Sequence, residues 1–142
     1  MQWLGTLTVV GIVVLAALVW VLLRMRLRDH LDELMAKRRG NCRIVSRADF
    51  VEGLERIPVA LALTDDAIHY ENPDLQATME LRHIEEVEYD DETATGQTVV
   101  GKALRLRSHG HTFEFIMDAA TAKQWVPLLP PHHIDEAPAR AV

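Results

Sequence analysis

The sequence contains a single cysteine, Cys42, and this scarcity limits the chemistry open to the chain. One thiol cannot form an intramolecular disulfide, and it cannot build a metal site from several thiolates. Because structural disulfides are rare in the cytoplasm, the composition suits a reducing compartment. We interpret Cys42 as incidental to the fold and to function.

Signatures of catalysis are also missing. The chain has no G-x-S-x-G nucleophile turn, no glycine-rich phosphate loop and no H-E-x-x-H zinc motif. Cys42 has no base placed beside it in the sequence. The sequence therefore predicts that the protein is not an enzyme and needs no cofactor.

Charge and proline are absent from the segment between Trp3 and Leu23. As a helix this segment would be about 31 Å long, which matches the roughly 30 Å hydrocarbon core of a bilayer. A secretory signal peptide would have a basic start, a shorter apolar stretch and a small-x-small cleavage site, whereas here Ala16 and Ala17 are the only small pair near the end of the run. We predict an uncleaved helix that spans the membrane once.

Lysine and arginine are absent before this apolar run and abundant after it. The residues expected to lie near the membrane are Arg24, Arg26, Arg28, Lys37, Arg38 and Arg39. Because Lys and Arg are enriched in cytoplasmic flanks, the asymmetry places the N-terminus outside and the rest of the chain in the cytoplasm. We expect a single-pass protein of the plasma (inner) membrane.

The net charge of −6 is unevenly distributed. Residues 24–43 carry seven basic and three acidic side chains, a net charge of +4, whereas residues 44–131 carry seven basic and sixteen acidic ones, a net charge of −9. An anionic leaflet attracts the first segment, and both the leaflet and nucleic acid repel the second. Nucleic acid is therefore not an expected partner.

The basic segment has a narrow apolar face. Four apolar residues recur there at helical spacing: Leu27, Leu31, Leu34 and Met35. The membrane helix is expected to continue as a stalk to about Arg39 and to stop at Gly40. Three placements of the apolar face are open, namely packing on the following domain, lying in the headgroup layer, or pairing with a second copy in a weak homo-oligomer. Packing on the domain is the simplest.

After Asn41 the apolar residues alternate with polar ones, which predicts strands. The expected elements are a hairpin at 58–72, strands at 76–81 and 84–91, a loop at 91–102 and a second hairpin at 103–117. The hairpin turns are expected at Asp65–Asp66 and His109–Gly110.

A helix is expected to close the domain. Asp118 is placed to cap it, and Pro127 ends or bends it, so that its body extends from Ala119 to Val126 or Leu129. The side chains expected to face the core are Ala122, Trp125, Val126 and Leu129.

Four segments within residues 43–130 together resemble bacterial pleckstrin-homology-like (PH-like) domains. They are VALALTDDAIHYEN, HIEEVEYDD, ALRLRSHGHTFEFIMD and AATAKQWVPLL. The closer resemblance is to small single-span bacterial membrane proteins that carry such a domain at the cytoplasmic end. It implies an N-terminal transmembrane helix followed by an α+β, mainly β PH-like barrel, which is a bent antiparallel sheet capped by a C-terminal helix.

The implied division of the chain has three parts. Residues 1–40 hold the transmembrane helix (about 3–23) and the basic stalk (24–40), residues 41–131 form the PH-like domain, and residues 132–142 form a disordered tail. PH-like domains that bind phosphoinositides use a Lys/Arg-rich loop between their first two strands. Here the corresponding segment sets Arg47 and Arg56 against three carboxylates, so no headgroup site is transferred from the family.

The remaining candidates are charged surface residues. The candidate partner surface comprises Glu86, Glu88 and Asp90 on one predicted strand and Arg105 and Arg107, which are expected to face outward, on the second hairpin. A solvated strand face is the plain alternative. No metal site is expected, because the acidic run lacks calcium-loop spacing and His109 and His111 lack a third ligand of fixed spacing.

With no catalytic motif, we expect a membrane-anchored binding or scaffolding module that recognises a protein partner at the inner face of the membrane. Two alternatives remain. The first is sensing of lipid headgroups at the leaflet through the basic stalk with Arg105 and Arg107. The second is an accessory subunit of a membrane transport or envelope-assembly complex.

Overall fold

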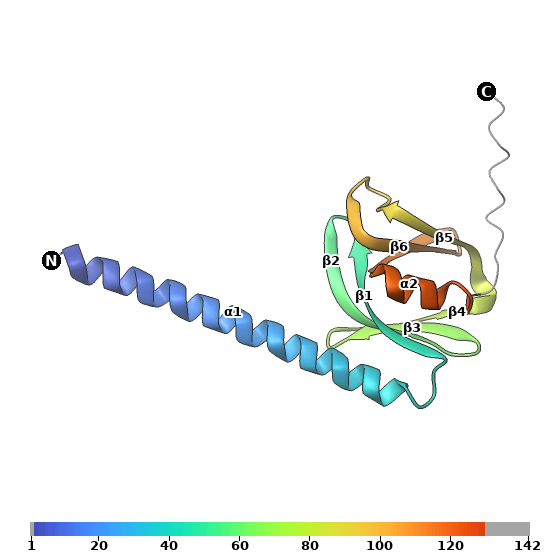
Figure 1. Cartoon of the computed structure of the whole chain (residues 1–142), viewed down its shortest axis with the longest axis horizontal. Helices are drawn as coiled ribbons and strands as arrows, with labels where there is room; N and C mark the ends of the chain where they lie inside the picture. Colours follow the sequence, from blue (N-terminus) through green and yellow to red (C-terminus); the bar gives the residue numbers. More distant parts are fainter. Residues whose placement is uncertain (1, 130–142) are drawn as a thin grey trace, which may run out of the picture.

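The computed structural model describes residues 2–129, which form a long helix, an antiparallel sheet and two short helices (Figure 1). Helix α1 (Gln2–Arg38) comes first. The strands are β1 (Ile44–Glu52), β2 (Glu55–Leu63), β3 (Ala67–Asn72), β4 (Leu75–Glu80), β5 (Ile84–Glu92), β6 (Thr98–Ser108) and β7 (His111–Met117). The 3-10 helix η1 (Leu81–His83) precedes β5, and α2 (Ala119–Trp125) follows β7. The tail predicted at 132–142 lies outside the described residues.

Helix α1 is unbroken, so the apolar run and the basic stalk belong to one helix. It ends at Arg38, one residue before the predicted end. The part from Trp3 onward is long and apolar enough to cross a membrane, and its most apolar stretch is not buried against any described residue. Both observations agree with the predicted single span.

The strands of residues 44–117 form one open sheet in the order β4-β3-β2-β1-β7-β6-β5. Both predicted hairpins are confirmed: Leu61 pairs with Tyr70 across β2 and β3, and Leu104 pairs with Phe115 across β6 and β7. Strand β1 joins the two halves by pairing with β2 and with β7. The sheet curves around α2 (Figure 1).

The core lies between the inner face of the sheet and α2. Alternation along the strands points Leu61, Leu104 and Phe115 inward, where they are fully buried. Trp125 of α2 is fully buried among them. Its indole Nε1 donates a hydrogen bond of 2.8 Å to Oγ of Ser46, so the polar atom of this large side chain has a partner inside the core.

The stalk packs on the outer face of the sheet through its apolar stripe. Leu31 and Met35 are buried against Ala60 of β2. Beyond this contact, Arg38 Nε donates a hydrogen bond of 2.6 Å to Oε1 of Glu71, whose side chain is nearly buried. Of the three placements considered for the apolar stripe, packing on the domain is therefore the one observed.

The contribution of this packing to the attachment of the domain to the stalk can be tested. We expect Leu31→Ala to weaken the contact by about 2 kcal/mol, because it removes a side chain buried between the stalk and the outer face of the sheet. The distribution of distances between spin labels on the stalk and on α2 should broaden in the full chain. Glu33→Ala, an exposed neighbour on the stalk, should leave the distribution unchanged. Equal distributions for both variants would contradict the role of Leu31.

The prediction of a loop at residues 91–102 is wrong. Strand β5 continues to Glu92 and β6 begins at Thr98. Val99 is buried on the outer face of the sheet with Ala103 and Ile116, which explains why this apolar residue interrupts the polar stretch. A short turn replaces the expected loop.

Strand β1 was not predicted, and its two faces show why. Ala48 and Phe50 face the core, whereas Val45 contacts the stalk and Arg47 lies beside it. Because both faces are covered and polar residues occur on each, the alternation is blurred. At the other end of the domain, Asp118 caps α2 as predicted, but Val126 is exposed rather than in the core.

Candidate functional site

The fold brings charged side chains together in two regions. The first is the outer surface of strands β5, β6 and β7, here called the charged surface of β5–β7. Glu88, Arg105 and Glu114 lie directly opposite one another on three neighbouring strands. Arg105 Nη1 donates to Glu88 at 2.8 Å, and its Nε and Nη2 donate to Oε2 of Glu114 at 3.1 and 3.0 Å. Asp90 lies 3.6 Å away from Nη1. One guanidinium thus holds three carboxylates together.

The Arg105 network is withdrawn from solvent at Arg105 and Glu114 and open to it at Glu88 and Asp90. The side chain of Arg105 is 16% exposed and that of Glu114 is 6% exposed. Burial alone would lower the pKa of Arg105, but its hydrogen bonds to Glu88 and Glu114 outweigh burial and raise the pKa above its ordinary value. Arg105 lies on the outer face of the sheet, as predicted, but its charge is already shared among carboxylates.

Arg107, two residues further along β6, has different surroundings. Its side chain is 49% exposed, and its carboxylate neighbours, Glu86 at 3.6 Å and Glu85 at 3.7 Å, are themselves about half exposed. The fold brings all five predicted partner-surface residues to one surface but divides them into two groups. Glu88 and Asp90 gather around the partly buried Arg105, with a hydrogen bond of 2.8 Å to Glu88, whereas Glu86 and Arg107 are both about half exposed and 3.6 Å apart.

Glu114 was missed as a member of this surface although the sequence contained a signal for it. The predicted turn at His109–Gly110 fixes the register of the hairpin, and counting back from the turn places Arg105 opposite Glu114. Glu114 also accepts a hydrogen bond of 3.0 Å from the backbone N–H of Ala94, which ties the β5–β6 turn to β7.

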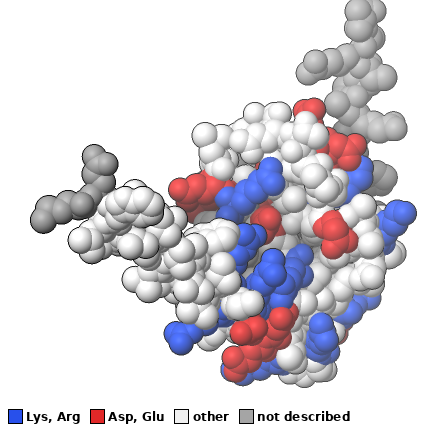
Figure 2. Space-filling model, turned by 60° about the vertical axis from the view of Figure 1, so that its left-hand side comes forward, with Lys and Arg blue, Asp and Glu red and all other residues white. Residues whose placement is uncertain are grey.

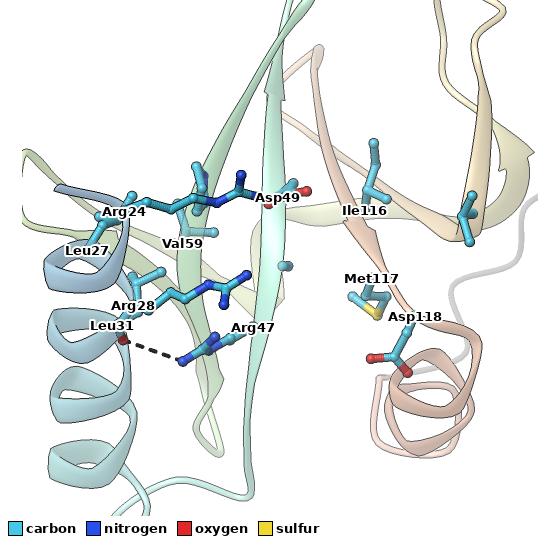
Figure 3. A pocket seen from close by; sticks show the side chains of 13 residues that line it. Arg24, Leu27, Arg28, Leu31, Arg47, Asp49, Val59, Ile116, Met117 and Asp118 are labelled. Atoms are coloured by element: carbon cyan, nitrogen blue, oxygen red, sulfur yellow. Dashed lines mark hydrogen bonds between the residues drawn. The ribbon is translucent and has the colours of Figure 1, made fainter. Parts of the chain in front are cut away.

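The second region, here called the stalk crevice, lies between α1 and the sheet and encloses about 320 Å³. Figure 2 shows Lys and Arg side chains gathered where the helix meets the domain. In the close view, Arg24 and Arg28 extend from α1 toward β1, and Arg47 extends from β1 toward α1 (Figure 3). The two acidic residues that line the crevice are Asp49 and Asp118.

The cations of the stalk crevice differ in their partners. Arg47 forms an ion pair with Asp32 and donates a hydrogen bond of 3.4 Å to the carbonyl oxygen of Arg28. The guanidinium of Arg24 lies 5.2 Å from the ring centre of Trp20. Within residues 2–129, no ion pair joins Arg24 or Arg28 to a carboxylate.

The acidic lining is only partly available to balance these cations. Asp118 accepts hydrogen bonds from the backbone N–H of Thr121 at 2.7 Å and from its hydroxyl at 2.8 Å. The backbone hydrogen bond has the larger effect and the hydroxyl bond the smaller one, and both lower the pKa of Asp118. Its charge is thereby committed to the cap of α2. Asp49 is the remaining carboxylate of the lining, and Arg47 is already paired with Asp32, so Arg24 and Arg28 face one available acid.

The fold separates the six membrane-proximal basic residues that the sequence grouped together. Arg24 and Arg28 line the crevice, and Arg38 is held by Glu71. The other three, Arg26, Lys37 and Arg39, lie on the stalk outside the crevice. Arg47 was missed as a member, because only the docking of α1 on β1 brings it near the stalk.

A smaller cavity of about 260 Å³ lies near the turn of the β6–β7 hairpin. The rings of His83 and His109 lie 4.5 Å apart there, with His111 also in the lining. Among residues 2–129, no group of three His, Cys, Asp or Glu side chains is arranged to hold a metal ion.

Comparisons with known proteins identify a fold relative but no family. No protein-family model matches the chain, and no curated protein matches it. Among solved structures, it is similar to the C-terminal domain of an unknown protein from Leishmania infantum, with a TM-score of 0.50 and 13% sequence identity. The match covers 75% of this chain and 94% of the other. At this identity the likeness concerns the fold alone.

Proposed function

We propose that this chain is a single-pass protein of a bacterial inner membrane whose cytoplasmic domain is a PH-like binding module for a protein partner. The PH-like assignment rests on the sequence resemblance and on the order of the elements, a curved antiparallel sheet followed by one helix against its inner face. The orientation rests on the basic stalk that follows the apolar run.

One observation supports protein recognition above the other candidates. Helix α1 contacts β1, β2 and β3, whereas the charged surface of β5–β7 lies on the other half of the sheet. That surface is acidic, so an anionic leaflet repels it and it is left available to a partner approaching from the cytoplasm.

The accessible end of this surface, Glu85, Glu86 and Arg107, is the part proposed to contact the partner. Charge at the rim of an interface mainly steers association and fixes specificity. Glu88 is unsuitable for a test, because its carboxylate accepts a hydrogen bond from Arg105 and its reversal would disturb the fold.

A photoreactive residue at Thr112, which is exposed opposite Arg107, would report contact without removing a charge. In native membranes we expect a discrete crosslinked product, and we expect Glu85→Lys with Glu86→Lys to reduce it by about fivefold or more. The matched control is Asp65→Lys with Asp74→Lys, an equal change of charge at exposed sites outside this surface. Equal loss in both double variants, or no discrete product, would contradict the proposal.

A further inference from the structure

The stalk crevice lies at a defined depth relative to the apolar run. Arg24, which lines it, directly follows Leu23, the last residue of that run. If the run spans the hydrocarbon core, as proposed above, Arg24 and Arg28 lie in the layer of lipid headgroups. The crevice therefore opens where phosphate groups are concentrated.

The rim of the crevice carries an apolar side chain that has no cover in the domain. Val100 lines the crevice and is 99% exposed. Leu54, at the turn between β1 and β2, is 74% exposed, and Figure 1 shows that this turn lies on the side of the domain that faces the N-terminal part of α1. Exposed aliphatic side chains beside a cluster of cations suit the boundary between headgroups and acyl chains.

We propose that the stalk crevice binds the phosphate group of an anionic phospholipid from the leaflet in which α1 is anchored. Arg24 and Arg28 supply guanidinium groups without ion pairs to described carboxylates, and Arg47 closes the far wall. The volume of about 320 Å³ falls within the range of about 300 to 1,000 Å³ found for ligand pockets.

This site differs from the phosphoinositide loop of PH-like domains. In this chain the first two strands are joined by the tight turn Gly53–Leu54, which contains no cation. The proposed site instead uses the membrane helix as one wall and the outer face of the sheet as the other. It also goes beyond the proposed partner surface, which lies on β5 and β6.

The full-length protein in detergent micelles, studied by native mass spectrometry, gives a direct test. The probes are phosphatidylglycerol and phosphatidylcholine with identical acyl chains. We expect one phosphatidylglycerol to bind at least about tenfold more tightly, because the crevice has excess positive charge. Each arginine is expected to contribute roughly fivefold to affinity, so Arg24→Gln with Arg28→Gln should weaken phosphatidylglycerol binding by about 25-fold.

Two controls separate the crevice from diffuse attraction to the stalk. Lys37→Gln with Arg39→Gln removes the same charge from the end of the stalk, outside the crevice, and should change binding by less than about twofold. Asp49→Asn removes the available acid of the lining and should tighten phosphatidylglycerol binding, an effect that misfolding cannot imitate.

The proposal would be overturned if Lys37→Gln with Arg39→Gln weakened phosphatidylglycerol binding as much as Arg24→Gln with Arg28→Gln does. It would also be overturned if the protein showed no preference for phosphatidylglycerol over phosphatidylcholine. Soluble glycerol phosphate that binds as tightly as the lipid would overturn the assignment to the membrane. Because the test uses purified protein without a partner, its outcome is independent of the crosslinking experiment at Thr112.

Discussion

Replacing Arg105 with glutamine is expected to lower the free energy of unfolding by about 3 to 5 kcal/mol, the range for breaking a buried ion pair. The variant leaves Glu114, which is 6% exposed, without its guanidinium partner. The backbone N–H of Ala94 is then the remaining hydrogen-bond donor to this carboxylate among the described residues. A nearly buried charge with so few donors is costly.

The same substitution at Arg107 is the matched control. Arg107 lies on the same strand and the same face, but it is 49% exposed and its carboxylates are 3.6 Å or more away. Arg107→Gln should therefore change the free energy of unfolding by less than about 1 kcal/mol.

Urea denaturation of the full chain in detergent, followed by circular dichroism, measures both variants. Arg105→Gln with Glu114→Gln should be more stable than Arg105→Gln alone, because the second change removes the orphaned charge. Equal destabilisation by the two single variants would show that Arg105 and Arg107 have the same role, and would contradict the structure of this surface.

Replacing Trp125 with alanine is expected to destabilise the domain by about 3 to 5 kcal/mol. Trp125 is fully buried between α2 and the sheet, and it donates the hydrogen bond that satisfies Ser46. The variant creates a cavity and also leaves the buried hydroxyl of Ser46 without this partner. Loss of α2 from the sheet should appear as early loss of the near-ultraviolet circular dichroism signal on heating.

One further variant separates packing from hydrogen bonding at this position, and a second is the exposed control. Trp125→Phe keeps an aromatic ring and should lose less than Trp125→Ala. Val126→Ala, on the same helix but exposed, should change stability by less than about 0.5 kcal/mol. A similar effect of Trp125→Ala and Val126→Ala would contradict the placement of Trp125 in the core.

The parts of the fold predicted correctly depend on local patterns. Alternation predicted Leu104 and Leu106 as core residues, and both are fully buried. The cap at Asp118 and the turn at His109–Gly110 were predicted because turn and cap chemistry is set by residues close in sequence. Helical spacing likewise found the apolar face of the stalk.

The parts that were missed depend on contacts between distant segments. The register of the hairpin sets Arg105 opposite Glu114 and Arg107 opposite Thr112, but only the pairing of β5 with β6 brings Glu88 to the other side of Arg105. The crevice needs α1 to lie on β1, a contact that joins residues such as Asp32 and Arg47. Such contacts are set by tertiary packing, which local periodicity does not report.

Because α1 is continuous, a movement of its apolar part is transmitted to the domain that packs on its stalk. A helix whose apolar length differs from the thickness of the bilayer adapts by tilting. In the proposed membrane setting the domain is fixed to the same helix through Leu31, Met35 and Arg38, so tilting carries the domain along with it. A change in bilayer thickness would then rotate the surface of β5–β7 relative to the bilayer. It would also move the rim of the stalk crevice at Val100 toward the bilayer or away from it. If α1 spans the membrane as proposed, the thickness of the bilayer would set the position of the β5–β7 surface and of the stalk crevice relative to the headgroups.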